Sequence, residues 1–250
     1  MYVKRIISVA LTVVLLGGVL FFDSSLYADS TDIQDPEGTP EQEFIVVINA
    51  GHQSKGNFKK ESIGPGSGTK KYKVAGGTSG VSTGVKESTR NLQIAKLLTK
   101  DLEAKGIKVY MVRTKGNVNI SNAERAKFAN KKKADLVISL HCDASSNSGV
   151  KGITMLVPKK NKWTKKFHKE SKKAGKIVLE NVIGQTKANN RGISKRGDIT
   201  GFNHSKIPTI LIEMGFMTNK KEDKKLGKPA YQKKLAKGMA NGIEKYLQNQ

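Results

Sequence analysis

The sequence has few of the residues that build cross-linked or aromatic-rich domains. Its 250 residues include one cysteine, one tryptophan, six prolines and four histidines. One cysteine cannot form an internal disulfide, and it excludes the cysteine-rich zinc modules. Any bound metal must therefore be held mainly by histidine and carboxylate. Because 37% of the residues are hydrophobic, the chain can bury a core, and wholesale disorder is excluded.

Acidic residues are also scarce. The chain has 21 Asp and Glu against 45 Lys and Arg, which gives a formal net charge of +24. Such an excess of positive charge favours a polyanionic partner, either nucleic acid, an anionic membrane surface or an acidic polymer outside the cell. Composition alone does not choose among these three classes.

The first 28 residues have the order of an export signal. Lys4 and Arg5 precede an uncharged run over 6–22, and small residues follow up to Ala28. About 17 apolar residues are fewer than the roughly 20 that span a bilayer, so we expect cleavage after Ala28. Because Leu26 is larger than cleavage sites prefer, an uncleaved membrane anchor is the alternative. Either way we expect the protein to act outside the cytoplasm, either secreted or anchored to the membrane.

Residues 29–43 predict a flexible acidic linker. The stretch 23–43 carries seven acidic residues, two prolines and no basic residue. Without residues 1–43, the chain keeps 43 basic and 14 acidic residues, a net charge of +29. The predicted catalytic domain, 44–250, is thus more basic than the whole chain. Its location outside the cytoplasm argues against nucleic acid as the partner.

The domain alternates between strand-like and helical patterns. Short runs rich in Val, Ile and Leu predict buried strands over 44–49, 107–113, 135–140, 152–157 and 209–213. Apolar residues with helical spacing predict helices over 92–102, 121–128, 167–182 and 235–247. The fold class is therefore α/β, a single domain with a mostly parallel twisted sheet of about five or six strands flanked by helices. Residues 53–86 are rich in Gly and Lys and predict a long loop with a functional role.

Four ionisable residues fall where strands end or helices begin. His52 follows the first strand, His141 follows the third, Glu213 closes the fifth, and Glu87 precedes a helix. Because ligands bind at the carboxyl ends of the strands in open α/β sheets, these side chains can converge on one site. Two histidines and a glutamate form a catalytic zinc set that leaves a position free for water, and a second glutamate can act as general base.

The other reactive residues receive structural interpretations. Cys142 should point away from His141 and fill the core, whereas Asp143 shares the face of His141 and is a candidate to orient it. We interpret His168, in a lysine-rich helix, as a surface residue. His204 lies in a polar loop and is a weaker candidate for substrate contact.

Several motifs in order resemble a known family. VVINAGHQSKGN, GVKESTRN, NISNAERAKFANKKKADLVISLHCDAS, NRGISKRGDITGFNHSKIPTILIEMGFMTN and the closing helix are similar to the zinc-dependent N-acetylmuramoyl-L-alanine amidases of the amidase 3 family. The resemblance covers roughly residues 44–248. It implies that His52, Glu87 and His141 bind Zn²⁺ and that Glu213 is catalytic, in a monomer that cleaves the amide between N-acetylmuramic acid and L-alanine.

This chain departs from the family pattern at three places. It has Asn49 and Ala50 where many members have Asp and Pro, and Cys142 where Ala or Asn is common. It also looks like a subgroup with a GHQ motif and a long Gly/Lys-rich insertion between His52 and Glu87. None of these departures replaces a ligand that the resemblance implies.

The resemblance gives the basic surface an interpretation. Peptidoglycan carries stem-peptide carboxylates, and many walls also carry anionic polymers, so we expect these to be the partners and nucleic acid not to be. Candidate contacts are Lys59, Lys60, Lys70, Lys71 and Lys73 in the insertion, and Lys159, Lys160, Lys165 and Lys166 near Trp163. Two alternatives stay open, namely another zinc peptidase acting on wall peptides and a non-catalytic basic wall-binding protein on an amidase fold.

Overall fold

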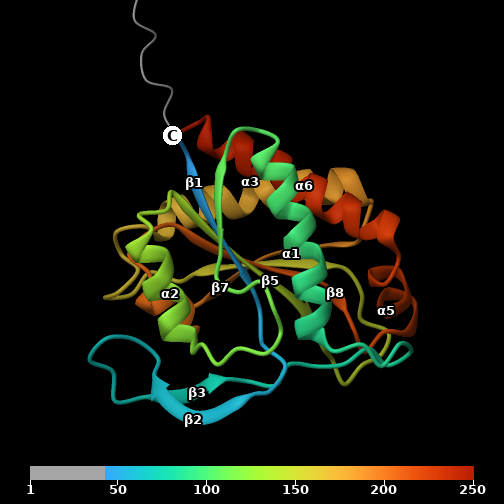
Figure 1. The fold of residues 1–250 in the computed structure, drawn as a ribbon, viewed down its shortest axis with the longest axis horizontal. Coiled ribbons are helices and arrows are strands. Elements are labelled where there is room, and N and C mark those ends of the chain that lie inside the picture. Colours follow the sequence, from blue (N-terminus) through green and yellow to red (C-terminus); the bar gives the residue numbers. More distant parts are fainter. Residues whose placement is uncertain (1–42) are drawn as a thin grey trace, which may run out of the picture. The chain divides into compact units, whose positions relative to one another are not determined.

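A six-stranded sheet forms the centre of the computed structural model, which describes residues 43–250 (Figure 1). The strand order is β4-β1-β5-β8-β6-β7. The strands are β1 (Ile45–Ala50), β4 (Lys108–Met111), β5 (Leu136–Asp143), β6 (Ile153–Pro158), β7 (Asn190–Arg196) and β8 (Thr209–Phe216). The first four in the sheet are parallel, whereas β6 pairs antiparallel with β8 and parallel with β7. The predicted α/β class and the strand number are confirmed.

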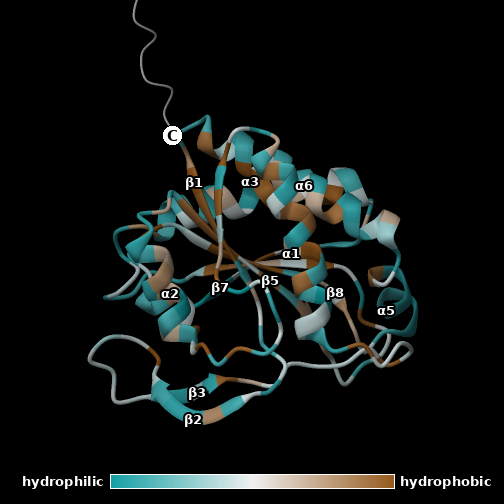
Figure 2. Cartoon of the chain, viewed as in Figure 1, coloured by the Kyte–Doolittle hydropathy of each residue, from teal (hydrophilic) through white to brown (hydrophobic). Residues whose placement is uncertain are grey.

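Three long helices cover one face of the sheet. They are α1 (Glu87–Glu103), α3 (His168–Thr186) and α6 (Pro229–Leu247). Their apolar stripes pack on alternate residues of β1, β5, β6 and β8 to form the main core. The brown inner faces and teal outer faces of these helices in Figure 2 follow this pattern. The four predicted helices correspond to α1, α2 (Asn122–Lys131), α3 and α6.

The opposite face is covered more sparsely. The helix α2 begins with a capping box, in which Ser121 and Glu124 exchange hydrogen bonds with each other's backbone amides. It packs on the sheet beside the short helix α4 (Thr200–His204). Another short helix, α5 (Lys220–Leu226), follows β8. The sparse cover on the α2 and α4 side leaves room for a cavity.

Two glycines let α3 and α6 approach closely. A Cβ at Gly238 would lie 2.7 Å from the Cα atom of Val182, and one at Gly242 would lie 2.6 Å from the Cα atom of Val178. Real Cβ atoms do not come so near to backbone, so these positions require glycine. The small-residue stripe of α6 thus sets the spacing of the helix pair.

The segment 53–86 differs from the long loop that the sequence predicts. It contains the antiparallel hairpin of β2 (Asn57–Ser62) and β3 (Lys70–Val74), which lies beside α2 in Figure 1. Its strands are polar and exposed, so they lack the buried apolar pattern by which strands are recognised. The strand β7 was missed for the same reason, since its sequence NRGISKR reads as loop.

The N-terminal predictions concern other residues. The predicted signal or anchor, 1–28, and residues 29–42 of the predicted linker lie outside the described residues. Glu43, the last linker residue, pairs with Lys108 at 3.0 Å. Within residues 43–250, none of the helices has the length and apolar character needed to cross a membrane.

Candidate metal centre

His52 adopts a backbone conformation that is rare for residues other than glycine. Its φ is +58°, directly after β1, and the Arg125 guanidinium fixes it by donating to the His52 carbonyl at 3.0 Å. The ring Nδ1 lies 2.8 Å from the Ala75 carbonyl, to which it donates. This hydrogen bond leaves Nε2 to face Glu87, with 3.1 Å between Nε2 and Oε2.

Glu87 is the buried first residue of α1. Its Oε1 accepts from the Cys142 amide at 3.1 Å and from Asn91 at 3.2 Å, and its Oε2 accepts from the Thr78 amide at 3.1 Å. Burial alone would raise the pKa of Glu87, but hydrogen bonds from His141 and His52 hold that pKa well below its ordinary value. The carboxylate is therefore ionised and held in one orientation.

His141 completes the group from inside β5. Its Nδ1 lies 3.1 Å from Glu87 Oε1, and its ring stands edge-on to that of His52, with 4.8 Å between centroids. Burial lowers the pKa of His141, which favours the neutral ring that a metal requires. A Cβ at Gly51 would lie 2.3 Å from this ring, so the glycine before His52 makes room for it.

The three predicted ligands are thus brought together. The donor atoms of His52, Glu87 and His141 all lie within 4.8 Å of one another, and they form the one such group found among residues 43–250. His141 does not follow its strand as predicted, because β5 continues to Asp143. The sequence did not predict that the strand extends beyond residue 140, because the apolar run ends there.

Glu213 lies beside the group on the neighbouring strand. It pairs with His141 in the parallel register of β5 and β8, and β8 continues past it to Phe216. Its Oε2 is buried, with no hydrogen-bond partner among the described residues. Burial raises the pKa of Glu213 well above its ordinary value, and the charges of Asp143 and Glu87 add to the shift.

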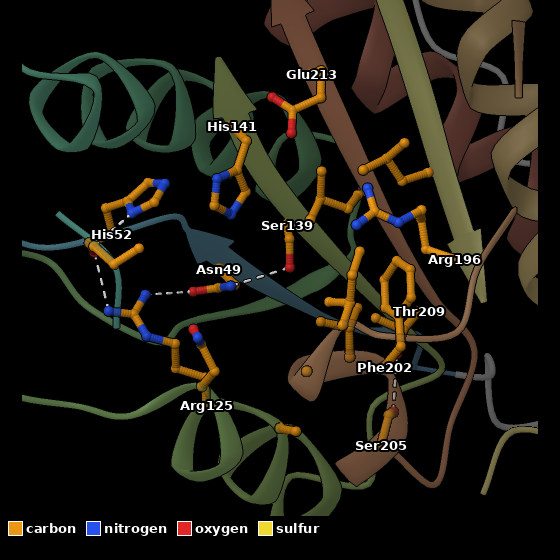
Figure 3. Close-up of a pocket in the computed structure, with 18 residues that line it drawn as sticks. Asn49, His52, Arg125, Ser139, His141, Arg196, Phe202, Ser205, Thr209 and Glu213 are labelled. Carbon is orange, nitrogen blue, oxygen red and sulfur yellow. Dashed lines mark hydrogen bonds between the residues drawn. The ribbon is translucent and has the colours of Figure 1, made fainter. Parts of the chain in front are cut away.

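The histidines and Glu213 line one end of a cavity of about 410 Å³ on the α2 and α4 side of the sheet (Figure 3). Glu87, which contacts both histidines, does not line it. The other end is formed by Arg196, Phe202, Ser205 and Thr209, and Leu156 and Leu211 add apolar wall. The cavity therefore joins a cluster of metal-type ligands to a partly apolar pocket.

Two buried arginines that the sequence did not single out shape this site. Arg125 donates to Asn49 Oδ1, to Gln53 Oε1 and to the Ala50, His52 and Ile120 carbonyls. Arg113 donates to the carbonyls of Ala50, Gly51 and Ser88. Burial lowers the pKa of both guanidinium groups to about 10. Charged residues in a helix or after a strand usually face solvent. The sequence pattern around Arg113 and Arg125 gave no sign that they are buried.

The remaining sequence candidates have mixed outcomes. Cys142 is buried in the core, as predicted. Asp143 makes no hydrogen bond to His141, and its Oδ1 accepts from the Ala144 amide. His168 begins α3 near the surface, with Nδ1 donating to the Lys165 carbonyl at 3.2 Å. His204 does not line the cavity, and its Nε2 donates to the Ser62 carbonyl of β2 at 3.0 Å.

Known proteins of one family match most of the chain. The family model described as N-acetylmuramoyl-L-alanine amidase matches residues 46–245. The N-acetylmuramoyl-L-alanine amidase Rv3717 of Mycobacterium tuberculosis is 27% identical over 220 residues, which cover 83% of this chain and 88% of that protein. YqiI, an uncharacterised protein of Bacillus subtilis, is 28% identical over 167 residues, covering 66% of this chain and 77% of that protein.

Solved structures share the fold. The N-acetylmuramoyl-L-alanine amidase of Clostridium difficile 630 superposes with a TM-score of 0.70 and 29% identity, covering 84% of this chain and all of that chain. Ami1 of Mycobacterium smegmatis superposes with a TM-score of 0.74 at 23% identity, covering 83% of this chain and 98% of that chain. The single α/β domain with a mostly parallel central sheet is therefore shared with these amidases.

Proposed function

The chain belongs to the N-acetylmuramoyl-L-alanine amidase family, and we propose that it is a zinc-dependent member that acts on peptidoglycan. The proposed reaction hydrolyses the amide between the lactyl group of N-acetylmuramic acid and the L-alanine of the stem peptide. One observation carries the proposal. A His-Glu-His cluster lies beside a buried, unpartnered glutamate oxygen at one end of the cavity.

The residues fit a zinc ion. Donor atoms bound to one tetrahedral zinc at about 2.0–2.2 Å lie roughly 3.3–3.6 Å apart. The separations of 3.1 Å from His52 Nε2 to Glu87 Oε2 and from His141 Nδ1 to Glu87 Oε1 are close to this spacing. All three donor atoms lie within 4.8 Å of one another, so a modest inward movement of the side chains would reach it. The hydrogen bond from His52 Nδ1 to Ala75 and those to Glu87 are the orienting contacts that such ligands use. A zinc ion bound here supplies Lewis acidity that polarises the scissile carbonyl and makes water a better nucleophile.

Glu213 supplies the proton transfer in this proposal. Its Oε2 has no competing hydrogen bond among the described residues, so it is free to accept a proton from the attacking water. Burial raises the pKa of Glu213, which makes its carboxylate a stronger proton acceptor than an exposed one. Glu213 then passes the proton to the leaving amine of L-alanine.

The Glu213→Gln variant tests this role. A glutamine of the same size cannot accept the proton, so we expect activity on purified peptidoglycan to fall about 10²–10⁴-fold while zinc content is unchanged. Glu213→Asp should also lose most activity, because the carboxylate is shorter by one methylene. Dye release from labelled peptidoglycan and elemental analysis measure the two quantities. Hydrolysis by Glu213→Gln at the wild-type rate would disprove the assignment.

Fragment identification separates the proposed reaction from the alternatives. Purified peptidoglycan is digested with and without a chelator, and the products are analysed by mass spectrometry. We expect stem peptides with free L-alanine amino termini, and we expect the chelator to abolish them. Cuts inside the stem peptide would indicate a zinc peptidase instead. A protein that holds zinc and releases no fragment would indicate a non-catalytic wall-binding role.

We further propose that the protein works outside the cytoplasm and binds wall polymers through its positive charge. The support is the +29 charge of residues 44–250 together with the export-like order of the first 28 residues. Carboxylates of the stem peptides and phosphates of anionic polymers have the complementary charge.

A further inference from the structure

The β2–β3 hairpin forms one wall of a second groove next to the catalytic cavity. This groove has a volume of about 490 Å³ and is lined by the hairpin residues Lys60, Lys70, Lys71 and Tyr72, and by Asp198 and Thr200 across from them. It shares Ala75, Asn122 and Ile199 with the catalytic cavity. The cavity and the groove therefore adjoin, and a substrate held in the cavity can extend into the groove.

The hairpin is fixed to the body of the domain by hydrogen bonds at two points. Glu61 accepts from the Ala123 amide at the start of α2 at 3.1 Å, and Trp163 donates to the Pro65 carbonyl at 2.8 Å. At its base, the Ala75 carbonyl accepts from His52. These contacts hold the wall of the groove in a defined position relative to the proposed zinc ligands.

The groove carries an excess of positive charge. Three lysines line it against one carboxylate, that of Asp198. Asp198 already accepts two hydrogen bonds from Arg196 at 2.8 Å and one from Lys71 at 2.7 Å. The Arg196 guanidinium, with Lys71, holds the pKa of Asp198 well below its ordinary value, so this carboxylate stays ionised and occupied.

Two ammonium groups are left for a ligand. Neither Lys60 nor Lys70 pairs with a carboxylate in residues 43–250, and both are exposed. Lys60 is the register partner of Tyr72, whose ring is half-exposed and stands edge-on to Phe58 with 5.3 Å between centroids. The groove thus offers two unpaired ammonium groups next to an aromatic surface. This arrangement can bind a ligand that carries a negatively charged group beside an apolar segment.

We propose that this groove is an extension of the active site that binds a carboxylate of the stem peptide and makes the enzyme prefer stem peptides with a free acid over amidated ones. The proposal rests on the proposed function, and it adds a role for the insertion. The nearest such carboxylate belongs to the glutamate that follows L-alanine, one residue from the scissile amide. Its neutral isoglutamine form keeps the shape and loses the charge.

Binding of the released stem peptide tests the groove independently of catalysis. The probes are L-alanyl-D-glutamyl stem peptides in the acid form and in the isoglutamine form, which the proposed reaction cannot cleave again. Their affinity for the zinc-loaded protein is measured by calorimetry at low salt. We expect wild type to bind the acid form about tenfold more tightly, the effect of one charge-assisted hydrogen bond near solvent. We expect the double variant Lys60→Gln/Lys70→Gln to bind both forms equally.

The double variant Lys169→Gln/Lys172→Gln is the matched control. It removes two exposed lysines from α3, which covers the opposite face of the sheet, and it should keep the wild-type preference. If wild type binds both peptides equally, or if Lys60→Gln/Lys70→Gln keeps the preference, the proposal is wrong. Equal loss of the preference in both double variants would also overturn it, because the effect would then come from net charge alone.

Failure of the proposed function gives a different result. In that case mass spectrometry shows no free L-alanine termini, whatever the peptide affinities are. Digestion of peptidoglycan whose stems are acidic or amidated adds the kinetic measurement. We expect kcat/KM of Lys60→Gln/Lys70→Gln to fall about tenfold on acidic stems and to be unchanged on amidated stems. An equal fall on both substrates would overturn the carboxylate preference while leaving the amidase function intact.

Discussion

At the scale of single residues, the proposed zinc ligands could be found from the sequence because strands mark their positions. His52, His141 and Glu213 each adjoin an apolar run that folds into β1, β5 or β8. Glu87 was marked by the helix that it begins. The arginines that support the site have no comparable signal in the sequence. Arg113 and Arg125 resemble surface charges in sequence, and only the folded chain shows that carbonyl groups surround them.

Three of the four histidines provide a test of the ligand assignment with its own control. We expect His52→Ala and His141→Ala each to lower the zinc content from about one ion per chain to below about 0.1, because two remaining ligands bind zinc weakly. His168→Ala should keep full zinc, since His168 lies outside the ligand group and its ring donates to the Lys165 carbonyl. Elemental analysis after dialysis measures the content. Full occupancy in both ligand variants is incompatible with the site described above.

At the scale of helices and strands, apolar periodicity predicted the elements that are buried on one side or both. The five apolar runs became β1, β4, β5, β6 and β8, and the four helical patterns lie within or beside the observed helices. The hairpin and β7 were missed because their residues are mostly polar and their pairing depends on partners distant in sequence. The antiparallel direction of β6 likewise has no local signal.

The close approach of α3 and α6 leads to a stability prediction. Gly238→Ala and Gly242→Ala place a methyl group against the backbone of α3, so we expect each to lower the free energy of unfolding by about 1–3 kcal/mol. Gly184→Ala is the control. Gly184 is exposed in α3, and a Cβ added there would meet no atom of another element within 4 Å, so the substitution should stabilise the protein by about 0.5–1 kcal/mol through helix propensity. Chemical denaturation measures all three, and a Gly242→Ala variant as stable as wild type would contradict the helix packing.

Asp198 forms ion pairs with Lys71 of β3 and Arg196 of β7, and this Asp198 cluster joins the hairpin to β7. It also makes the stability of the protein depend on pH. The pKa of Asp198 is depressed in the folded state, so its ion pairs stabilise the protein above the ordinary pKa of about 4 and are lost as the pH falls toward the folded value. Because the cluster is half-exposed, we expect Asp198→Asn to cost about 0.5–1 kcal/mol at pH 7.

The pH dependence distinguishes this contribution from a simple packing defect. The difference between wild type and Asp198→Asn should be constant between pH 7 and 5 and should shrink below pH 4. Urea denaturation at several pH values measures it. Asp101→Asn, which removes a carboxylate without an ion pair in the described part of the chain, should show no such trend. If the difference in unfolding free energy between wild type and Asp198→Asn grows as the pH falls, the stabilising role of the ionised Asp198 is disproved.

At the scale of the whole molecule, the positive charge predicts a salt-dependent affinity for cell walls. The Debye length falls from about 10 Å at 0.1 M salt to about 3 Å at 1 M, so binding through exposed lysines should weaken steeply over this range. Sedimentation with isolated walls measures the bound fraction, and the Glu213→Gln variant prevents digestion during the experiment. Binding that does not change between the two salt concentrations would exclude charge as its cause.

The hydrogen bond from His52 to Ala75 limits which segment can be grafted between related amidases without disturbing His52. The hairpin that precedes Ala75 forms the second groove, whereas Ala75 itself orients a proposed zinc ligand. If the hairpin selects the stem peptide as proposed, a graft that replaces residues 57–74 should change this preference and keep the Ala75 carbonyl that orients His52. A graft that extends through residue 75 alters both at once. A graft that keeps Glu61 and Lys71, which join the hairpin to α2 and to Asp198, lets the groove change while the proposed zinc ligands stay the same.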